Sequence, residues 1–231
     1  MSIFQLFIDL KSEGFVRKGN ALFRVYGDGI FQTINYAKNN SSGPKEFSVG
    51  LQSMYSELKP QWFTARGCIP RYSMDKIVSQ SREYQENMKK VLDGNMEIQF
   101  PSPSEILVPW FNEITTQHQL IERLCSLDIA MRGTVIWVDG MKIAPYLSCG
   151  DYANAEKVVQ EILQQHKLAY RHNRVLFTAE QYEKYMEKRR AEDEKLENLL
   201  KMIQRQNHDE ISNYLQNNYL VNCQYAKFCM K

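Results

Sequence analysis

The sequence lacks the features that mark membrane, secreted and disulfide-rich proteins. No stretch of the 231 residues approaches the roughly 18 uninterrupted apolar residues of a transmembrane helix. The first residues have no positively charged region and no small-residue cleavage site, so they do not match a secretory signal peptide. Five cysteines occur without a Cys-x-x-Cys pair, which argues against a disulfide framework and against a zinc site. We therefore expect a cytoplasmic protein with no membrane partner, bound metal or cofactor.

The chain also lacks an excess of charge of either sign. Its 29 Lys and Arg residues stand against 27 Asp and Glu residues, which gives a net charge of only +2. A dedicated nucleic-acid binder usually carries a strong basic excess on its binding domain. We therefore do not expect a nucleic-acid partner.

Motifs that mark common catalytic sites are absent as well. The sequence contains no Gly-x-Ser-x-Gly, phosphate-binding P-loop, Gly-x-Gly-x-x-Gly or His-Glu-x-x-His. His166 and His172 are six residues apart, which misses the i,i+4 spacing of a helical metal pair. No catalytic residue is assigned on this basis, although a site assembled from distant residues stays an open alternative.

What is present in the first half is a helix followed by short strands. Residues 3–13 place their apolar side chains on one broad helical arc, and Gly14 is a plausible stop. The turn Gly27-Asp28-Gly29 separates two extended runs, 21–26 and 30–38, and predicts that they pair as an antiparallel hairpin. Apolar and polar residues alternate over 46–55, which predicts a third strand.

Further elements follow with weaker boundaries. Trp62-Phe63 and 134–138 are predicted strands, whereas 73–92 and 105–127 have the apolar spacing of helices. Together these patterns predict an α+β fold, in which an N-terminal helix packs on an antiparallel sheet of three to five strands. A mainly helical C-terminal part follows.

The C-terminal part contains one repeat-like phrase and two long helical patterns. Residues 144–156 resemble the helix-turn-helix junction of a tetratricopeptide repeat, and only one such unit occurs. Thr178 and Gln181 predict a capping box at the start of a charged helix that extends to about residue 206. A last helix is predicted over 211–228. We expect two regions, an α+β domain at 1–140 and a helical region at 141–231.

Several segments of the first region match those of a known family, namely the N-terminal helix and residues 14–23, 31–38, 47–51, 68–71 and 108–111. Over about residues 1–128 the sequence thus resembles the bacterial proteins grouped as domain of unknown function 4304. The sequence departs from the family at Ala37, where a glutamine is expected, and over 73–100. Because the family has no assigned activity, the resemblance implies a helix with an antiparallel sheet and implies no substrate.

Seven residues are candidate contacts for a ligand or partner. The predicted strands bear a basic cluster and a polar residue, and two further arginines flank Cys68; the seven are Arg17, Lys18, Arg24, Asn35, Lys38, Arg66 and Arg71. Clustered cations can bind phosphates or carboxylates. Alternatively, Lys and Arg on an edge strand discourage unwanted strand pairing, and a polar residue such as Asn35 faces solvent on a one-sided sheet.

Two function classes are favoured by these patterns, and nucleic-acid binding, which a salt-dependent affinity would reveal, is a third alternative. The first is a non-catalytic binding module with a protein partner, which predicts that Trp110 and the tyrosines leave an apolar patch exposed. The second is a hydrolase or transferase that acts on an anionic small molecule, which predicts a deep polar cleft holding the basic cluster.

Overall fold

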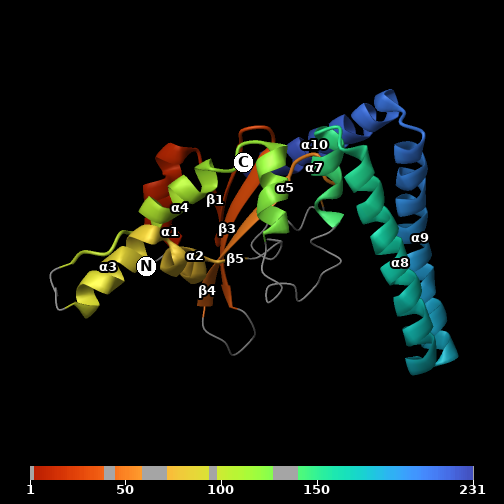
Figure 1. Ribbon diagram of the computed structural model, residues 1–231, viewed down its shortest axis with the longest axis horizontal. Helices are drawn as coiled ribbons and strands as arrows, with labels where there is room; N and C mark the ends of the chain where they lie inside the picture. The colour runs from red at the N-terminus through yellow and green to blue at the C-terminus, as the bar shows by residue number, and fades with distance from the viewer. Residues whose placement is uncertain (1–2, 39–44, 59–71, 94–97, 127–139, 231) are drawn as a thin grey trace.

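The computed structural model describes residues 3–38, 45–58, 72–93, 98–126 and 140–230. Over these ranges the fold is α+β, as predicted: an antiparallel sheet lies beside the N-terminal helices, and the C-terminal part is helical (Figure 1). Within these residues, no helix combines the length and the apolar character needed to cross a membrane.

Five strands form the sheet in chain order. They are β1 (Val16–Lys18), β2 (Ala21–Tyr26), β3 (Ile30–Lys38), β4 (Lys45–Ser53) and β5 (Tyr72–Ser73), and each pairs antiparallel with the next. The predicted hairpin joins β2 to β3. Its turn requires glycine, because Gly27 has φ +54° and a Cβ there would lie 2.1 Å from the Thr115 carbonyl oxygen. Chain order therefore places β1 at one edge.

One face of the sheet packs against the N-terminal helices. Helix α1 (Ile3–Leu10) ends in the short 3-10 helix η1 (Lys11–Glu13), and Gly14 closes it with φ +83°. Helices α2 (Met74–Gln80) and α4 (Pro103–Asn112) complete this layer. The buried core between helices and sheet contains Leu6, Leu10, Phe15, Leu22, Ile34, Val49, Leu107 and Phe111. The predicted docking of the first helix on the sheet is thus confirmed.

The opposite face of the sheet is met by the end of the chain. Helix α10 (His208–Met230) contributes Ala226 to a buried cluster with Phe23 and Phe31. The amide of Asn222 donates to the carbonyl oxygens of Met54 and Ser56, at 2.7 Å each. Residues from both predicted regions therefore share one packing cluster, and the boundary at 140 stays a prediction.

Two predicted long helices are each divided in the structure. The segment 73–92 forms α2 and α3 (Arg82–Leu92), because the Ser81 side chain accepts the Tyr84 N–H and starts a new helix. The segment 105–127 forms α4 and α5 (Gln117–Cys125), with a capping box between Thr116 and Gln119. Apolar spacing continues across both breaks, which is why it predicted single helices.

Helices α7 (Ile143–Ser148) and α8 (Tyr152–Leu176) occupy the repeat-like phrase. Helix α9 (Ala179–Gln204) then returns along α8, and the predicted capping box of Thr178 and Gln181 is confirmed. These two long helices project from the rest of the molecule as a hairpin (Figure 1), which we call the arm, residues 152–204. The predicted strands at 62–63 and 134–138 lie outside the described residues.

Candidate functional site

The predicted basic cluster does not assemble into one surface. Arg17 and Lys18 lie exposed on the edge strand β1, and successive strand residues point to opposite sheet faces. Arg17 pairs with Leu22 across the ladder, so its side chain shares a face with Arg24, whereas that of Lys18 does not. This position agrees with the interpretation that charge protects an edge strand from unwanted pairing.

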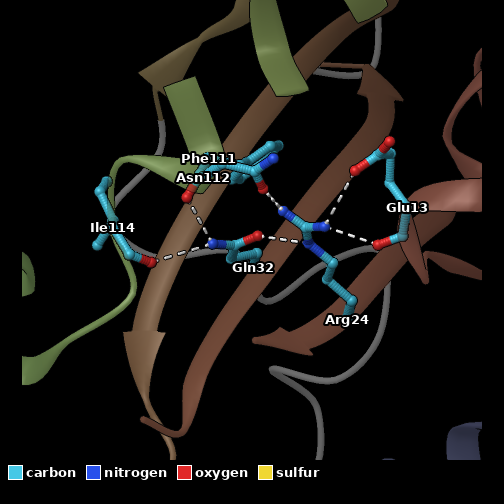
Figure 2. A network of polar contacts seen from close by, with 6 residues as sticks. All are labelled: Glu13, Arg24, Gln32, Phe111, Asn112 and Ile114. Carbon is cyan, nitrogen blue, oxygen red and sulfur yellow. Dashed lines mark hydrogen bonds and ion pairs between the residues drawn. The ribbon is translucent and has the colours of Figure 1, made fainter. Parts of the chain in front are cut away.

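Arg24 is buried rather than exposed, and its guanidinium bonds to the protein itself (Figure 2). It is 5% exposed and donates from Nε to the Gln32 Oε1 at 2.7 Å, and from Nη1 to the Glu13 carbonyl oxygen at 2.6 Å. Its Nη2 donates to the Asn112 Oδ1. The guanidinium therefore links β2 to β3, η1 and the end of α4.

Gln32 extends this network into the turn after α4. Its amide nitrogen donates to the carbonyl oxygen of Phe111 at 2.9 Å and to that of Ile114 at 3.4 Å, as Figure 2 shows. These carbonyls lie at and just after the end of α4, where the regular helical hydrogen bonding stops; the Phe111 oxygen also accepts the Ile114 N–H at 3.1 Å. Gln32 and Arg24 together satisfy buried backbone acceptors, which is a structural task.

Two aromatic rings flank the Arg24 guanidinium. Its Cζ lies 4.7 Å from the centre of the Phe15 ring and 4.1 Å from that of Tyr26. The pKa of Arg24 lies below the ordinary arginine value, because the effect of burial outweighs the opposing effects of Tyr26 and Glu13. Three protein acceptors and two rings thus surround the group, and burial separates it from ligands in solvent. Arg24 is thus placed in the core and not in a binding cluster.

Asn35 is also buried, at 2% exposure, so it does not lie on a solvated sheet face. It pairs with Ala21 on β2 and with Ser48 on β4, on the face opposite Gln32. Among the described residues, neither polar atom of its amide finds a hydrogen-bond partner. This side chain is separated from the exposed Arg17 by the sheet itself, and the two do not form one site.

The remaining candidates cannot be placed at side-chain level. Lys38 ends β3 opposite Lys45, and only its strand position is described. Arg66 and Arg71 lie outside the described residues. The cleft predicted by the enzyme hypothesis would need these cations beside Arg17, Lys18 and Asn35. Lys18 and Asn35 share one sheet face, on either side of Ala21, whereas Arg17 lies on the other face.

A polar cluster that the sequence analysis missed lies inside the arm. The Nδ1 of His166 lies 2.7 Å from the Asp193 Oδ1, and the Tyr170 hydroxyl donates to the other carboxylate oxygen. Burial and the bond to Asp193 raise the pKa of Tyr170. An Asp–His pair can activate a nucleophile when a Ser, Thr or Cys lies beside the His. The contacts that the structure gives to His166 are with Asp193 and Tyr170 and include no such residue. The cluster joins α8 to α9.

The described residues offer no alternative centre for metal chemistry. Within them, no group of three or more His, Cys, Asp and Glu side chains is arranged to hold a metal ion. Cys125 and Cys149 are exposed free thiols, and burial raises the pKa of Cys149, which disfavours its reactive thiolate.

The exposed apolar surface lies elsewhere than predicted. Trp110 packs against the core, with its ring 5.2 Å from that of Phe111, and the guanidinium of Arg123 lies over it. Instead, four large apolar side chains are exposed where α8 ends, namely Leu168 (56%), Val175 (84%), Leu176 (63%) and Phe177 (38%). Part of this signal was visible in the sequence, because Val175, Leu176 and Phe177 are consecutive and follow a mainly polar segment, 164–174.

This end of the arm is well packed despite its distance from the sheet. The ring of Tyr185 lies 5.7 Å from that of Phe177 and 6.0 Å from that of Tyr170, both edge to face. Tyr182 adds a third ring at 6.5 Å from Tyr185. Such aromatic pairs fix the turn between the helices. The exposed side chains of Val175 and Leu176 are therefore presented on a rigid support.

Comparisons with known proteins add no further information about the site. No family model, curated protein or solved structure matches the chain. The similarity of residues 1–128 to domain of unknown function 4304 stays a prediction.

Proposed function

We propose that the protein is a non-catalytic protein-interaction module and that its binding element is the arm. The observation that carries this proposal is the exposure of Leu168, Val175 and Leu176 at the end of α8. Apolar side chains that project together from a rigid element are typical of a docking surface, because a partner gains free energy by removing them from water.

The geometry of the arm supports the same conclusion. It projects away from the sheet (Figure 1), so a partner can approach its end without meeting the body of the protein. The aromatic rings of Phe177 and Tyr185 hold the turn, so little conformational entropy is lost when a partner binds. The buried network around Arg24 has no comparable access to solvent.

The experiment is site-specific photo-cross-linking in cells. A benzophenone side chain replaces Val175 in one variant and Leu92 in a second, because both residues are highly exposed, at 84% and 80%, and only Val175 is on the arm. We expect a discrete protein adduct from position 175 and none from position 92. The adduct should disappear when Leu168 and Leu176 are changed to Gln.

Two results would contradict the proposal. One is equal cross-linking from positions 175 and 92, and the other is an adduct that survives the loss of both leucines. Because the leucines are exposed, their replacement should leave the free energy of unfolding within about 0.5 kcal/mol of the wild-type value, which a denaturant titration checks.

A further inference from the structure

The end of α8 is basic as well as apolar. From Ile162 to Ala179 the sequence contains no Asp or Glu, and within this segment Lys167, Arg171 and Arg174 are all exposed. Helix α9 differs, because acids and cations alternate along most of its length. The charge of the arm is therefore unevenly divided between its two helices.

The cations of the two helices also differ in their pairing. On α9, Arg189 pairs with Glu192, Arg190 lies 3.7 Å from Glu183, and Lys195 lies 2.7 Å from Glu57. Among the ion pairs of the described residues, none involves Lys167, Arg171 or Arg174. Three cations that form no ion pair with the described part of the chain can meet carboxylates of another molecule.

Cations and apolar residues form adjacent rows along α8. Leu168 and Val175 are seven residues apart, which is two helical turns and about 10 Å along the axis. Lys167, Arg171 and Arg174 follow the i, i+4, i+7 spacing of a neighbouring row. A straight apolar row bordered by cations matches the surface of a helix with apolar residues on one side and carboxylates beside them.

From this pattern we infer that the arm binds an acidic amphipathic helix of a partner protein, along residues 167–176 of α8. The inference rests on the proposed function and specifies the chemistry of the partner. Apolar anchors of the partner would cover Leu168, Val175 and Leu176, and its carboxylates would pair with the three cations.

A second copy of this chain is a less suitable occupant. Leu92 on α3 follows Lys89 and Lys90, and α10 has no acid after Glu210 to accompany Leu220 and Val221. On α1, Asp9 does lie beside the exposed Ile8, but residues 5–10 expose no second large apolar side chain that could cover Leu168 and Val175 together. None of these described helices therefore combines a row of exposed apolar residues with acids.

An anionic lipid surface is also less suitable. Glu180, Glu183 and Glu187 are exposed in the first turns of α9, next to the same end of the arm. A flat anionic surface that approached the end would meet these carboxylates together with the cations of α8. A single helix, about 10 Å wide, can contact α8 alone.

The test uses two designed peptides and the full-length protein. Both peptides are helical, are about five turns long and carry Leu at the i, i+3, i+4, i+7 positions. The first has Glu and the second has Lys at the flanking positions. Fluorescence anisotropy should show saturable binding of the Glu peptide only, and raising NaCl from about 50 mM to about 500 mM should weaken it, because salt screens exposed charges.

Charge reversal at two sites supplies the matched comparison. Arg171→Glu with Arg174→Glu should weaken binding of the Glu peptide at least about tenfold and should allow the Lys peptide to bind. Lys188→Glu with Lys184→Glu makes the same change of charge on α9 and should leave the affinity within about twofold. Circular dichroism confirms that both variants fold, and Val175→Gln with Leu176→Gln tests the apolar contacts without altering charge.

Several results would overturn the inference. They are equal affinity for the Glu and Lys peptides, insensitivity to the Arg171 and Arg174 changes, or loss of affinity from the α9 changes instead. Binding to vesicles of phosphatidylserine that depends on Val175 would assign a lipid surface, and a dimer in sedimentation that depends on Val175 would assign a second copy. Specific cross-linking at position 175 together with failure of the Glu peptide would retain the proposed function and reject this partner.

Discussion

The described residues outside the arm, which we call the body, bury polar groups in a different way from the arm. In the body, the Arg24 guanidinium donates to three acceptors from three different segments and is 5% exposed. In the arm, Asp193 accepts from His166 and Tyr170, which are both on α8, and its side chain keeps 22% exposure. The first network joins many elements deep in the core, and the second joins only two helices near solvent.

This difference shows where binding can take place. A buried cation that donates to three segments of the protein is placed to hold those segments together and lies out of reach of a ligand in solvent. The arm has a thinner core, so fewer of its apolar side chains can be covered, and Val175 and Leu176 stay in contact with water. The cations available to a partner are therefore those on the exposed helix α8, and not Arg24.

The largest effect is expected from removing the buried cation. Arg24→Met leaves Gln32, Asn112 and the Glu13 carbonyl without their donor in the interior. Since unsatisfied buried acceptors are costly, we expect a loss of about 3–5 kcal/mol in the free energy of unfolding. Denaturant titration followed by circular dichroism measures it.

The matched control is Arg17→Met, on the exposed edge strand of the same sheet. The free energy of unfolding of this variant should stay within about 0.5 kcal/mol of the wild-type value. Equal stabilities for the two variants would contradict the structural role assigned to Arg24. Arg24→Lys sharpens the comparison, because an ammonium retains the charge without the fork that reaches all three acceptors.

A smaller and more local effect is expected in the arm. Asp193→Ala removes the shared acceptor of His166 and Tyr170, and we expect a loss of about 1–3 kcal/mol. Hydrogen exchange should become faster in α8 and α9 and stay unchanged in β2 and β3, because the cluster touches only the arm. Glu194→Ala, at an exposed neighbouring position, should alter neither region. Faster exchange throughout the sheet would show that the two regions unfold together.

Alkaline pH should weaken both regions through one tyrosine in each. Burial and the hydrogen bond to Asp28 raise the pKa of Tyr55 in the body to about 12, and burial with the bond to Asp193 raises the pKa of Tyr170 in the arm. A raised pKa means that the folded state holds the proton more tightly. The resulting stabilisation is complete below the ordinary tyrosine pKa of about 10 and is lost as pH rises through the folded-state value.

Absorbance of tyrosinate as a function of pH tests this expectation. Tyr55→Phe should remove a component that titrates near pH 12, and Tyr170→Phe should remove one that also lies above the ordinary range. The stability of each Phe variant should fall less between pH 10 and its folded-state value than that of the wild type. Titration of both residues near pH 10 would contradict the burial and hydrogen bonds described for them.

Local features were predictable from the sequence, whereas long-range partners were not. The turn at Gly27-Asp28-Gly29 and the cap at Thr178 depend on residues within three positions of each other, and the structure confirms both. Arg24 finds its acceptors 8, 11 and 88 residues away along the chain. Strand alternation showed only that it shares a face with Leu22, and nothing local distinguishes a buried arginine from one that protects a sheet edge.

The sequence predicted the charged helix of the arm but neither its buried polar cluster nor its proposed binding surface. A charged helix from Thr178 to about residue 206 was predicted from its cap and its apolar spacing. The structure places Asp193, from the middle of that helix, against His166 and Tyr170 of α8. The absence of acids over 162–179 could have indicated the binding surface, but the exposure of Val175 depends on where α9 packs.

The smallest effect is expected where the two regions meet through exposed charges. The Nζ of Lys195 on the arm lies 2.7 Å from the Oε1 of Glu57, which follows β4 in the body. Both side chains are mostly exposed, so water and salt weaken their attraction. A double-mutant cycle with Lys195→Ala and Glu57→Ala should therefore give a coupling energy below about 1 kcal/mol that vanishes in about 1 M NaCl. A larger coupling that persists in salt would mean that this pair fixes the arm on the body, and the arm would then be held by charge as firmly as Arg24 holds the core.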